Sequence, residues 1–179
     1  MLRTIEEIAE ELEGKTAQEV IKWAFGEYRD KAALASSFGA EDVVLIDMMV
    51  KINPKARVFT LDTGRLFPET YELMDKIRDK YKINIETYCP NAGLLEDMIN
   101  KNGFNLFYNS VEARKLCCNV RKIEPLNRAL KTLDAWICGL RREQSVTRTE
   151  VKKIERDEPH GGMAKINPLA GWTEKQVWD

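Results

Sequence analysis

Long hydrophobic runs and an excess of basic charge are both missing from this sequence. No apolar segment approaches the ~18 residues that a membrane-spanning helix needs, so we expect no membrane as a partner. The chain carries 28 Lys and Arg residues against 29 Asp and Glu residues, and this balance argues against nucleic acid as a partner. The start of the chain, Met1–Glu7, is acidic and amphipathic and does not resemble a signal peptide, so we predict a cytoplasmic protein.

Cysteine and histidine are scarce. The four cysteines are Cys89, Cys117, Cys118 and Cys138. In a cytosolic chain this number favours metal binding, redox chemistry or burial over a disulfide framework, and no two of them form a Cys-x-x-Cys pair. The single histidine, His160, stands beside Gly161 and Gly162 and offers no basis for a Ser/His/Asp or Cys/His prediction. We interpret it as a loop residue with a candidate ligand role.

Short apolar segments alternate with helical patterns along the 179 residues, a length that suits one domain. Apolar runs predict strands over 32–36, 57–61, 83–88 and 135–139, with Lys165–Ile166 as a candidate fifth. Helical spacing predicts helices over 5–13, 17–25, 41–50, 68–81, 94–100, 110–115 and 120–131. Because the strands are short and apolar rather than two-faced, the pattern predicts an α/β fold with a mostly parallel sheet covered on both faces.

Polar and glycine-containing segments follow the predicted strands at their carboxyl ends, where parallel sheets bind ligands. The first predicted strand is joined to a helix by the segment Ser36-Ser37-Phe38-Gly39-Ala40-Glu41-Asp42. Its hydroxyl groups, its glycine and the helix N-terminus that follows are suited to binding an anion. The same residues also suit a tight turn with serine caps. The second predicted strand ends in the segment Leu61-Asp62-Thr63-Gly64-Arg65. Here Asp62 can accept hydrogen bonds from a ligand, and Gly64 lets a ligand approach the backbone closely. The alternative is an ordinary turn that contains an Asp residue.

A basic segment containing the cysteine pair is the other unusual feature. Residues 110–153 hold 11 Lys and Arg against 5 Asp and Glu, a net charge of +6, whereas the rest of the chain has a net charge of −7. Arg121-Lys122 follows Cys117-Cys118, and Arg141-Arg142 follows the fourth predicted strand. Guanidinium groups suit phosphate and sulfate oxygens, so we predict an anionic ligand; a solvated helix face is the alternative. Two neighbouring thiolates, such as those of Cys117 and Cys118, can ligate two irons of one iron–sulfur cluster. The alternative is that the two thiols have no common role.

Taken together, these motifs resemble the assimilatory sulfonucleotide reductases, the adenylylsulfate (APS) and 3′-phosphoadenylylsulfate (PAPS) reductases. The segments that carry the resemblance are 36–42, 61–65, Cys117-Cys118-Asn119-Val120-Arg121-Lys122-Ile123-Glu124-Pro125-Leu126, Gly139-Leu140-Arg141-Arg142-Glu143-Gln144-Ser145, and Asn167-Pro168-Leu169 with Trp172-Thr173. Their order and spacing cover the chain from about Ala33 to Asp179. The cysteine pair is typical of the cluster-bearing APS branch.

The resemblance implies a three-layer α/β sandwich of the adenine nucleotide α-hydrolase-like (PP-loop) type. It also implies a site for APS or AMP in which the serine loop and the Leu-Asp-Thr-Gly segment line the pocket while basic side chains meet the phosphosulfate. Which of the two arginines lies closer is left open. The implied substrate-binding residues are Ser36, Ser37, Phe38, Gly39, Leu61, Asp62, Thr63, Gly64, Lys122, Arg141 and Arg142.

The resemblance further implies a reaction and a cofactor. Family members reduce the sulfonucleotide to sulfite and AMP through a cysteine S-sulfonate, which thioredoxin or a similar dithiol resolves. Cys117 and Cys118 would supply two of the four ligands of a 4Fe–4S cluster. The family's other two ligands, in a Cys-x-x-Cys pair, and its nucleophilic cysteine lie beyond the position of Asp179. We therefore expect residues 1–179 to form one sulfonucleotide-binding domain without the catalytic segment, inactive by itself.

Several alternatives stay open at this stage. PAPS, rather than APS, is the alternative substrate, and a nucleotide-binding remnant without catalysis is the non-enzymatic alternative. An ATP pyrophosphatase or a sulfate adenylyltransferase small subunit would carry a Ser-Gly-Gly-x-Asp-Ser loop, whereas this chain has Ser37-Phe38-Gly39-Ala40-Glu41-Asp42. A homo-oligomer is compatible with the sequence, which does not determine the number of subunits.

Overall fold

The computed structural model describes residues 3–146 and 148–179, so Met1 and Leu2 of the predicted acidic start lie outside the described residues. The strands are β1 (Ala32–Ala35), β2 (Arg57–Leu61), β3 (Ile85–Tyr88), β4 (Ala135–Ile137), β5 (Ile154–Asp157) and β6 (Met163–Ile166). The helices are α1 (Ile5–Glu13), α2 (Ala17–Tyr28), α3 (Ala40–Ile52), α4 (Pro68–Tyr81), α5 (Ala92–Asn102), α6 (Val111–Cys118), α7 (Glu124–Leu130) and α8 (Glu174–Trp178). No helix among the described residues is long and apolar enough to cross a bilayer.

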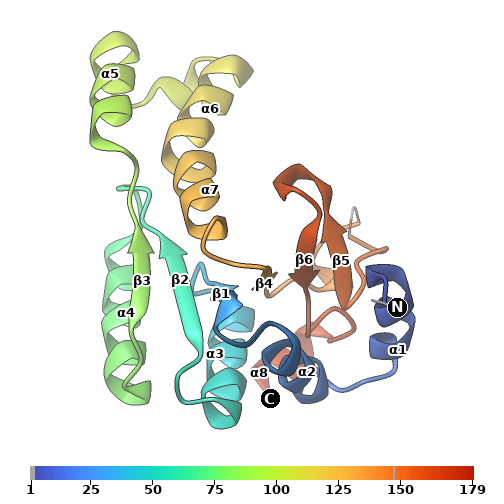
Figure 1. The fold of residues 1–179 in the computed structure, drawn as a ribbon. Helices are drawn as coiled ribbons and strands as arrows, with labels where there is room; N and C mark the ends of the chain where they lie inside the picture. Colours follow the sequence, from blue (N-terminus) through green and yellow to red (C-terminus); the bar gives the residue numbers. More distant parts are fainter. Residues whose placement is uncertain (1–2, 147) are drawn as a thin grey trace.

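The six strands form one sheet in the order β3-β2-β1-β4-β6-β5 (Figure 1). Every neighbouring pair is parallel except β5 with β6, which is antiparallel, so the predicted mostly parallel sheet is confirmed. Strand β5 was not predicted. Its sequence, Ile-Glu-Arg-Asp, has one apolar residue and therefore no apolar run that would predict a strand.

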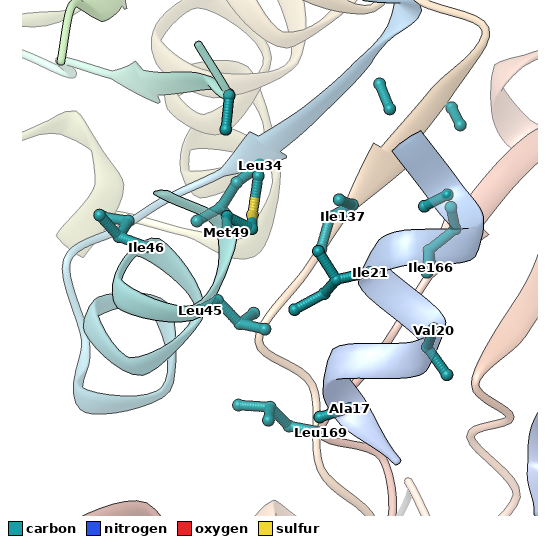
Figure 2. Packing of buried hydrophobic residues seen from close by; sticks show 14 of the residues in the cluster. Ala17, Val20, Ile21, Leu34, Leu45, Ile46, Met49, Ile137, Ile166 and Leu169 are labelled. Carbon is teal, nitrogen blue, oxygen red and sulfur yellow. The ribbon is translucent and has the colours of Figure 1, made fainter. Parts of the chain in front are cut away.

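Helices cover both faces of the sheet, and alternate strand residues serve the two faces. Leu34, Ile137 and Ile166 of three adjacent strands point toward α2 and α3, where they meet Ile21 and Leu45 (Figure 2). These side chains are fully buried and belong to the main hydrophobic core. The residues between them face α7, where a smaller cluster contains Ala33, Phe59, Ala129, Leu130 and Leu133. The result is the three-layer sandwich that the sequence predicts.

The sequence predicted that the cysteine pair lies between two separate helices, and this prediction is wrong. Cys117 and Cys118 form the last turn of α6, and the chain continues through a π-helical turn, Asn119–Ile123, directly into α7. Pro125 is tolerated because it lies in the first turn of α7. Cys117 packs with Met98 and Leu106 in a third small cluster beside α5. π-Helical turns are rare and are frequently found at functional sites.

Strand order reverses between β1 and β4, which creates a crevice at their carboxyl ends. From β1 the chain moves outward through α3 to β2 and through α4 to β3, and it then crosses the other face through α7 to reach β4. The loops after β1 and β4 therefore diverge to opposite faces of the sheet. Such a switch point is where open α/β sheets bind ligands.

Candidate nucleotide-binding site

A cavity of about 260 Å³ lies at the carboxyl ends of β1 and β2, between the sheet and α7. It brings together five of the residues that sequence reasoning selected, namely Ser36, Ser37, Leu61, Thr63 and Lys122. Its remaining lining is mostly apolar and consists of Ala35, Phe59, Thr60, Leu66, Leu126 and Trp136. An apolar chamber with hydroxyl groups and one ammonium group suits a ligand with an aromatic and an anionic end.

A second cavity of about 350 Å³ adjoins the first and shares Ala35, Ser37 and Trp136 with it. It lies between β1 and β4, and its other lining residues are Gly39, Glu41, Asp42, Cys138, Gly139, Leu140, Gln144, Arg148 and Lys165. The two cavities occupy the switch point together. Sequence reasoning missed Trp136, Arg148 and Lys165, because each belongs to a segment without a motif. The available signal was a bulky tryptophan in one predicted strand and small alanines in another; in the structure Trp136 is in register with Ala33.

The serine loop is held by its own side chains. Ser36 Oγ accepts a hydrogen bond of 3.1 Å from the Phe38 amide, and the backbone and hydroxyl of Ser37 donate to Asp42 Oδ2 at 2.6 and 3.0 Å. Phe38 has a φ of +63°, a strained value for a residue with a bulky side chain. Its ring packs into the main core rather than into a cavity, so Phe38 shapes the loop instead of lining the site. Gly39 precedes α3 and lines the second cavity.

Asp42 is a buried carboxyl at the start of α3. Burial raises its pKa, although the Ser37 hydrogen bonds act in the opposite direction. The start of α3 also lies close to the end of β4: a Cβ atom at Gly139 would be 2.6 Å from Asp42 Oδ1 and 2.9 Å from the Cβ atom of Glu41. Glycine is therefore required at this crossing.

The Leu61–Gly64 segment lines the first cavity through Leu61 and Thr63. The Asp62 carboxylate instead accepts 2.8 Å hydrogen bonds from the Gly64 amide and from the Tyr71 hydroxyl. This Asx-type turn uses the positive φ of Gly64, +68°. Asp62 and Gly64 thus fix the turn, and neither lines a cavity.

Arg121 is a buried cation that sequence reasoning passed over in favour of Lys122. Its Nη1 donates to the Thr63 carbonyl at 2.6 Å, which ties the π-helical turn to the Leu61–Gly64 segment. Its buried Nε has no hydrogen-bond partner among the described residues. Lys122, the next residue, lies on the cavity wall. The π-helical turn therefore supplies both a guanidinium group that holds the Leu61–Gly64 segment, from Arg121, and an exposed ammonium group on the cavity wall, from Lys122.

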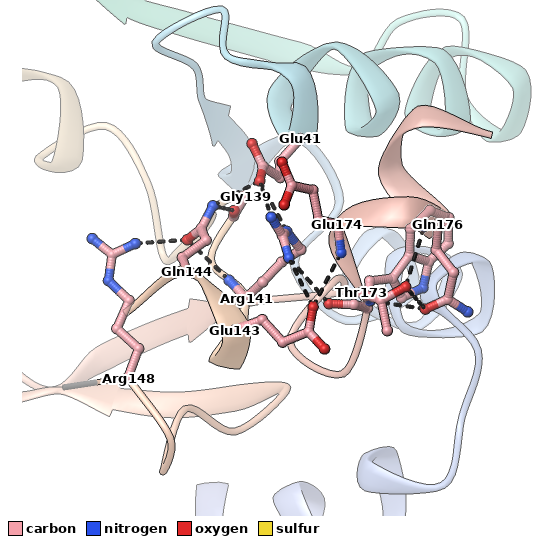
Figure 3. A network of polar contacts seen from close by, with 10 residues as sticks. Glu41, Gly139, Arg141, Glu143, Gln144, Arg148, Thr173, Glu174 and Gln176 are labelled. Atoms are coloured by element: carbon pink, nitrogen blue, oxygen red, sulfur yellow. Dashed lines mark hydrogen bonds and ion pairs between the residues drawn. The ribbon is translucent and has the colours of Figure 1, made fainter. Parts of the chain in front are cut away.

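The two predicted arginines point away from the cavities. Arg141 is buried and pairs with Glu41 at 2.9 Å within the polar network of Figure 3. Burial works against ionisation of Glu41, but hydrogen bonds from Gln144 and Arg141 outweigh it and lower the pKa of that carboxyl. Arg142 turns to the opposite side, where it donates to the Val151 carbonyl at 2.7 Å and pairs with Glu13 of α1.

Neither arginine lines the first or the second cavity, so a role for them in ligand binding stays a prediction. Arg141 reaches the second cavity through two residues that line it: its guanidinium group pairs with Glu41, and its backbone amide donates to Gln144 Oε1 at 3.1 Å. Arg142 lies beside α1 and contributes no lining atom to either cavity.

The cysteines provide only part of an iron–sulfur ligand set. Cys117 is buried, Cys118 is exposed, and within residues 3–146 and 148–179 no three Cys, His, Asp or Glu side chains gather as a metal site. Burial raises the pKa of the Cys138 thiol, which makes it a poor nucleophile and ligand. Cys89 is exposed, and its carbonyl accepts a hydrogen bond from Arg128 of α7. A 4Fe–4S cluster needs four thiolates, so these residues do not form a complete site.

A three-layer α/β domain with adjoining cavities at the switch point of its sheet has the adenine nucleotide α-hydrolase-like fold. A solved structure of FMN adenylyltransferase from Candida glabrata supports this fold, with a TM-score of 0.60, 13% identity, and coverage of 98% of this chain and 55% of that chain. The profile of the phosphoadenosine phosphosulfate reductase domain matches residues 31–179. The chain belongs to this family.

Individual relatives agree with the family assignment. The chain is 47% identical over 153 residues to an adenosine 5′-phosphosulfate reductase of Burkholderia cepacia, covering 86% of this chain and 61% of that protein. It is 48% identical over 149 residues to the enzyme of the same name from Allochromatium vinosum, covering 83% of this chain and 58% of that protein. A crystal structure of phosphoadenylyl-sulfate reductase from Candida auris, a phosphate complex, has a TM-score of 0.83 at 28% identity and covers 99% and 85% of the two chains. The chain thus spans about three fifths of the first two relatives.

Proposed function

We propose that residues 1–179 form a sulfonucleotide-binding domain for adenosine 5′-phosphosulfate. In this proposal the domain takes part in the thiol-dependent reduction of that compound to sulfite and AMP. The observation that carries the proposal is the first cavity, where Ser37, Thr63 and Lys122 share an apolar chamber at the switch point. Relatives that are 47% and 48% identical bear the name adenosine 5′-phosphosulfate reductase, which favours this substrate over its 3′-phosphorylated form.

The lining of the cavities suggests how the nucleotide is bound. The adenosine group packs against the apolar wall made by Phe59, Leu126 and Trp136. Its phosphosulfate lies toward Ser37 and the Lys122 ammonium group, which can donate hydrogen bonds to its oxygens. Together the volumes of the two cavities are in the range that small-molecule sites occupy.

The proposed reaction transfers a sulfonate group to a cysteine. A cysteine thiolate attacks the sulfur atom, the bond between sulfur and the bridging oxygen breaks, and AMP leaves with the bonding electrons. A dithiol such as thioredoxin then attacks the cysteine sulfur and releases sulfite, and its second thiol regenerates the enzyme cysteine as the dithiol is oxidised to a disulfide. Lys122 would stabilise the negative charge that develops on the leaving phosphate.

We do not assign the nucleophile to a cysteine of this chain. The resemblance places it in a family segment that is C-terminal to the matched region, and buried Cys138 is unsuited to the role. Cys117 and Cys118 are proposed as two of the four ligands of a 4Fe–4S cluster, whose other ligands the described residues do not supply.

Binding of AMP and of adenosine 5′-phosphosulfate to the 179-residue chain tests the proposal without requiring turnover. Isothermal titration should give saturable binding of both, and Lys122→Met should weaken the binding of adenosine 5′-phosphosulfate roughly tenfold, the loss expected for a hydrogen bond to a charged group. Lys115→Met removes an exposed lysine of α6 and serves as the matched control. Unchanged affinity in Lys122→Met, or preferential binding of the 3′-phosphorylated nucleotide, would contradict the assignment.

A further inference from the structure

Asp157, at the end of β5, joins the only histidine of the chain to the wall of the proposed nucleotide site. The carboxyl is buried and its Oδ2 atom has two partners. The Trp136 indole N–H donates to it at 2.9 Å, and His160 Nδ1 lies 2.8 Å from the same oxygen. The imidazole and indole rings meet edge to face, with 6.1 Å between their centroids. None of these contacts belongs to the motifs that define the family resemblance.

Trp136 is placed where a change in its orientation would alter both cavities. It lies in the middle of β4, in register with Ala33 on one side and Lys165 on the other, and it faces α7. Its side chain lines the first and the second cavity. The Lys165 ammonium group lies 5.7 Å from the centre of the indole ring. On the β1 side its neighbour is the small Ala33, so the indole hydrogen bond to Asp157, the edge-to-face contact with His160 and the Lys165 ammonium group are the contacts that favour one orientation of the ring.

We propose that Asp157 is a positioning residue for nucleotide binding, acting through Trp136, with His160 holding the carboxylate in place. This inference rests on the proposed function, because it concerns the same cavity. In a largely buried environment, an indole N–H without an acceptor costs the full desolvation of that group, so the ring has one strongly preferred orientation while Asp157 is present. His160 Nδ1 donates to the carboxylate and thereby fixes its rotamer.

A double-mutant cycle on AMP affinity distinguishes positioning from a structural role. Asp157→Ala and Trp136→Phe should each weaken AMP binding roughly tenfold, the loss expected for one hydrogen bond to a charged group. The double variant should bind no more weakly than Trp136→Phe, since Asp157 acts only through the indole N–H. Asp157→Asn keeps an acceptor oxygen and should recover part of the affinity. Glu158→Ala removes the neighbouring exposed carboxylate and is the matched control.

The only histidine supplies a second readout. Its imidazole signal in an NMR spectrum needs no assignment, and it should shift when AMP saturates the wild-type and Glu158→Ala chains but not the Asp157→Ala chain. Wild-type affinity in Asp157→Ala, additive losses in the double variant, or an unmoved His160 signal in AMP-saturated wild type would overturn the inference while leaving the proposed function intact. A wild-type chain that binds neither AMP nor adenosine 5′-phosphosulfate would overturn both.

Discussion

The two faces of the sheet are built from the same strands but serve different purposes. On the face toward α2 and α3, large side chains such as Leu34, Ile137 and Ile166 are fully buried and pack together in the main core (Figure 2). On the face toward α7, β1 contributes only Ala33 and Ala35, and the first cavity opens beside Ala35. Because successive side chains of a strand point to opposite faces of the sheet, neighbouring residues of β1 contribute in turn to the stable core and to the proposed binding site.

The filled face should give the largest loss of stability. Ile137→Ala removes a fully buried side chain from a central strand, and we expect the free energy of unfolding to fall by about 3 kcal/mol because a cavity remains where the neighbours cannot close in. Chemical denaturation measures this loss. Ile123→Ala, at an exposed position, should cost less than about 0.5 kcal/mol. Equal losses in the two variants would show that the main core is not where stability resides.

On the face toward α7, where the first cavity lies, a substitution should change ligand affinity more than stability. Ala35→Leu places a large side chain where both cavities meet, so AMP affinity should fall roughly a hundredfold, or about 2.7 kcal/mol, by steric exclusion. Calorimetric titration measures the loss. Ala35→Ser, which preserves the volume, should bind AMP almost as the wild type does. If Ala35→Leu retains full affinity, the nucleotide does not occupy these cavities.

The crossing of β4 and α3 links the two faces. At Gly139 an added methyl group would meet Asp42 and Glu41 at less than 3.0 Å, so Gly139→Ala should lower the free energy of unfolding by about 1–2 kcal/mol and weaken AMP binding as the serine loop shifts. Gly171→Ala is the control, since its nearest neighbour beyond the adjacent residues would be Arg142 Nη1 at 3.7 Å. Thermal unfolding curves of the two variants should differ clearly; identical curves would contradict the close approach.

Asp42 should give the smallest effect, visible as a pH dependence. Because burial raises its pKa in the folded chain, the carboxyl stabilises the fold most when protonated, below the unfolded-state pKa of about 3.9, and this contribution is lost as pH rises through the folded pKa. The stability of the wild type relative to Asp42→Asn should therefore decrease as pH rises above about 4. A relative stability that increases with pH would mean that the Ser37 hydrogen bonds dominate over burial.

The filled face and the loops of the site were largely predictable from the sequence. Apolar runs bounded by polar turns defined β1 to β4, and the serine and Leu-Asp-Thr-Gly motifs defined the loops that reach the first cavity. Strand β5 was missed because its sequence is mostly charged.

Features that depend on side-chain direction could not be predicted. Arg141 and Arg142 are adjacent in an extended-to-helical turn, so they diverge, one toward Glu41 and the other toward Glu13. The role of Trp136 likewise depends on which face of β4 it occupies and on Asp157, which lies 21 residues away in the chain.

A structure of the chain crystallised with AMP tests the central claim most directly. The account predicts adenosine against Leu126 and Trp136, with the phosphate within hydrogen-bonding distance of Ser37 and Lys122. Density for the nucleotide elsewhere, for example in the groove beside Arg142 and α1, would contradict it.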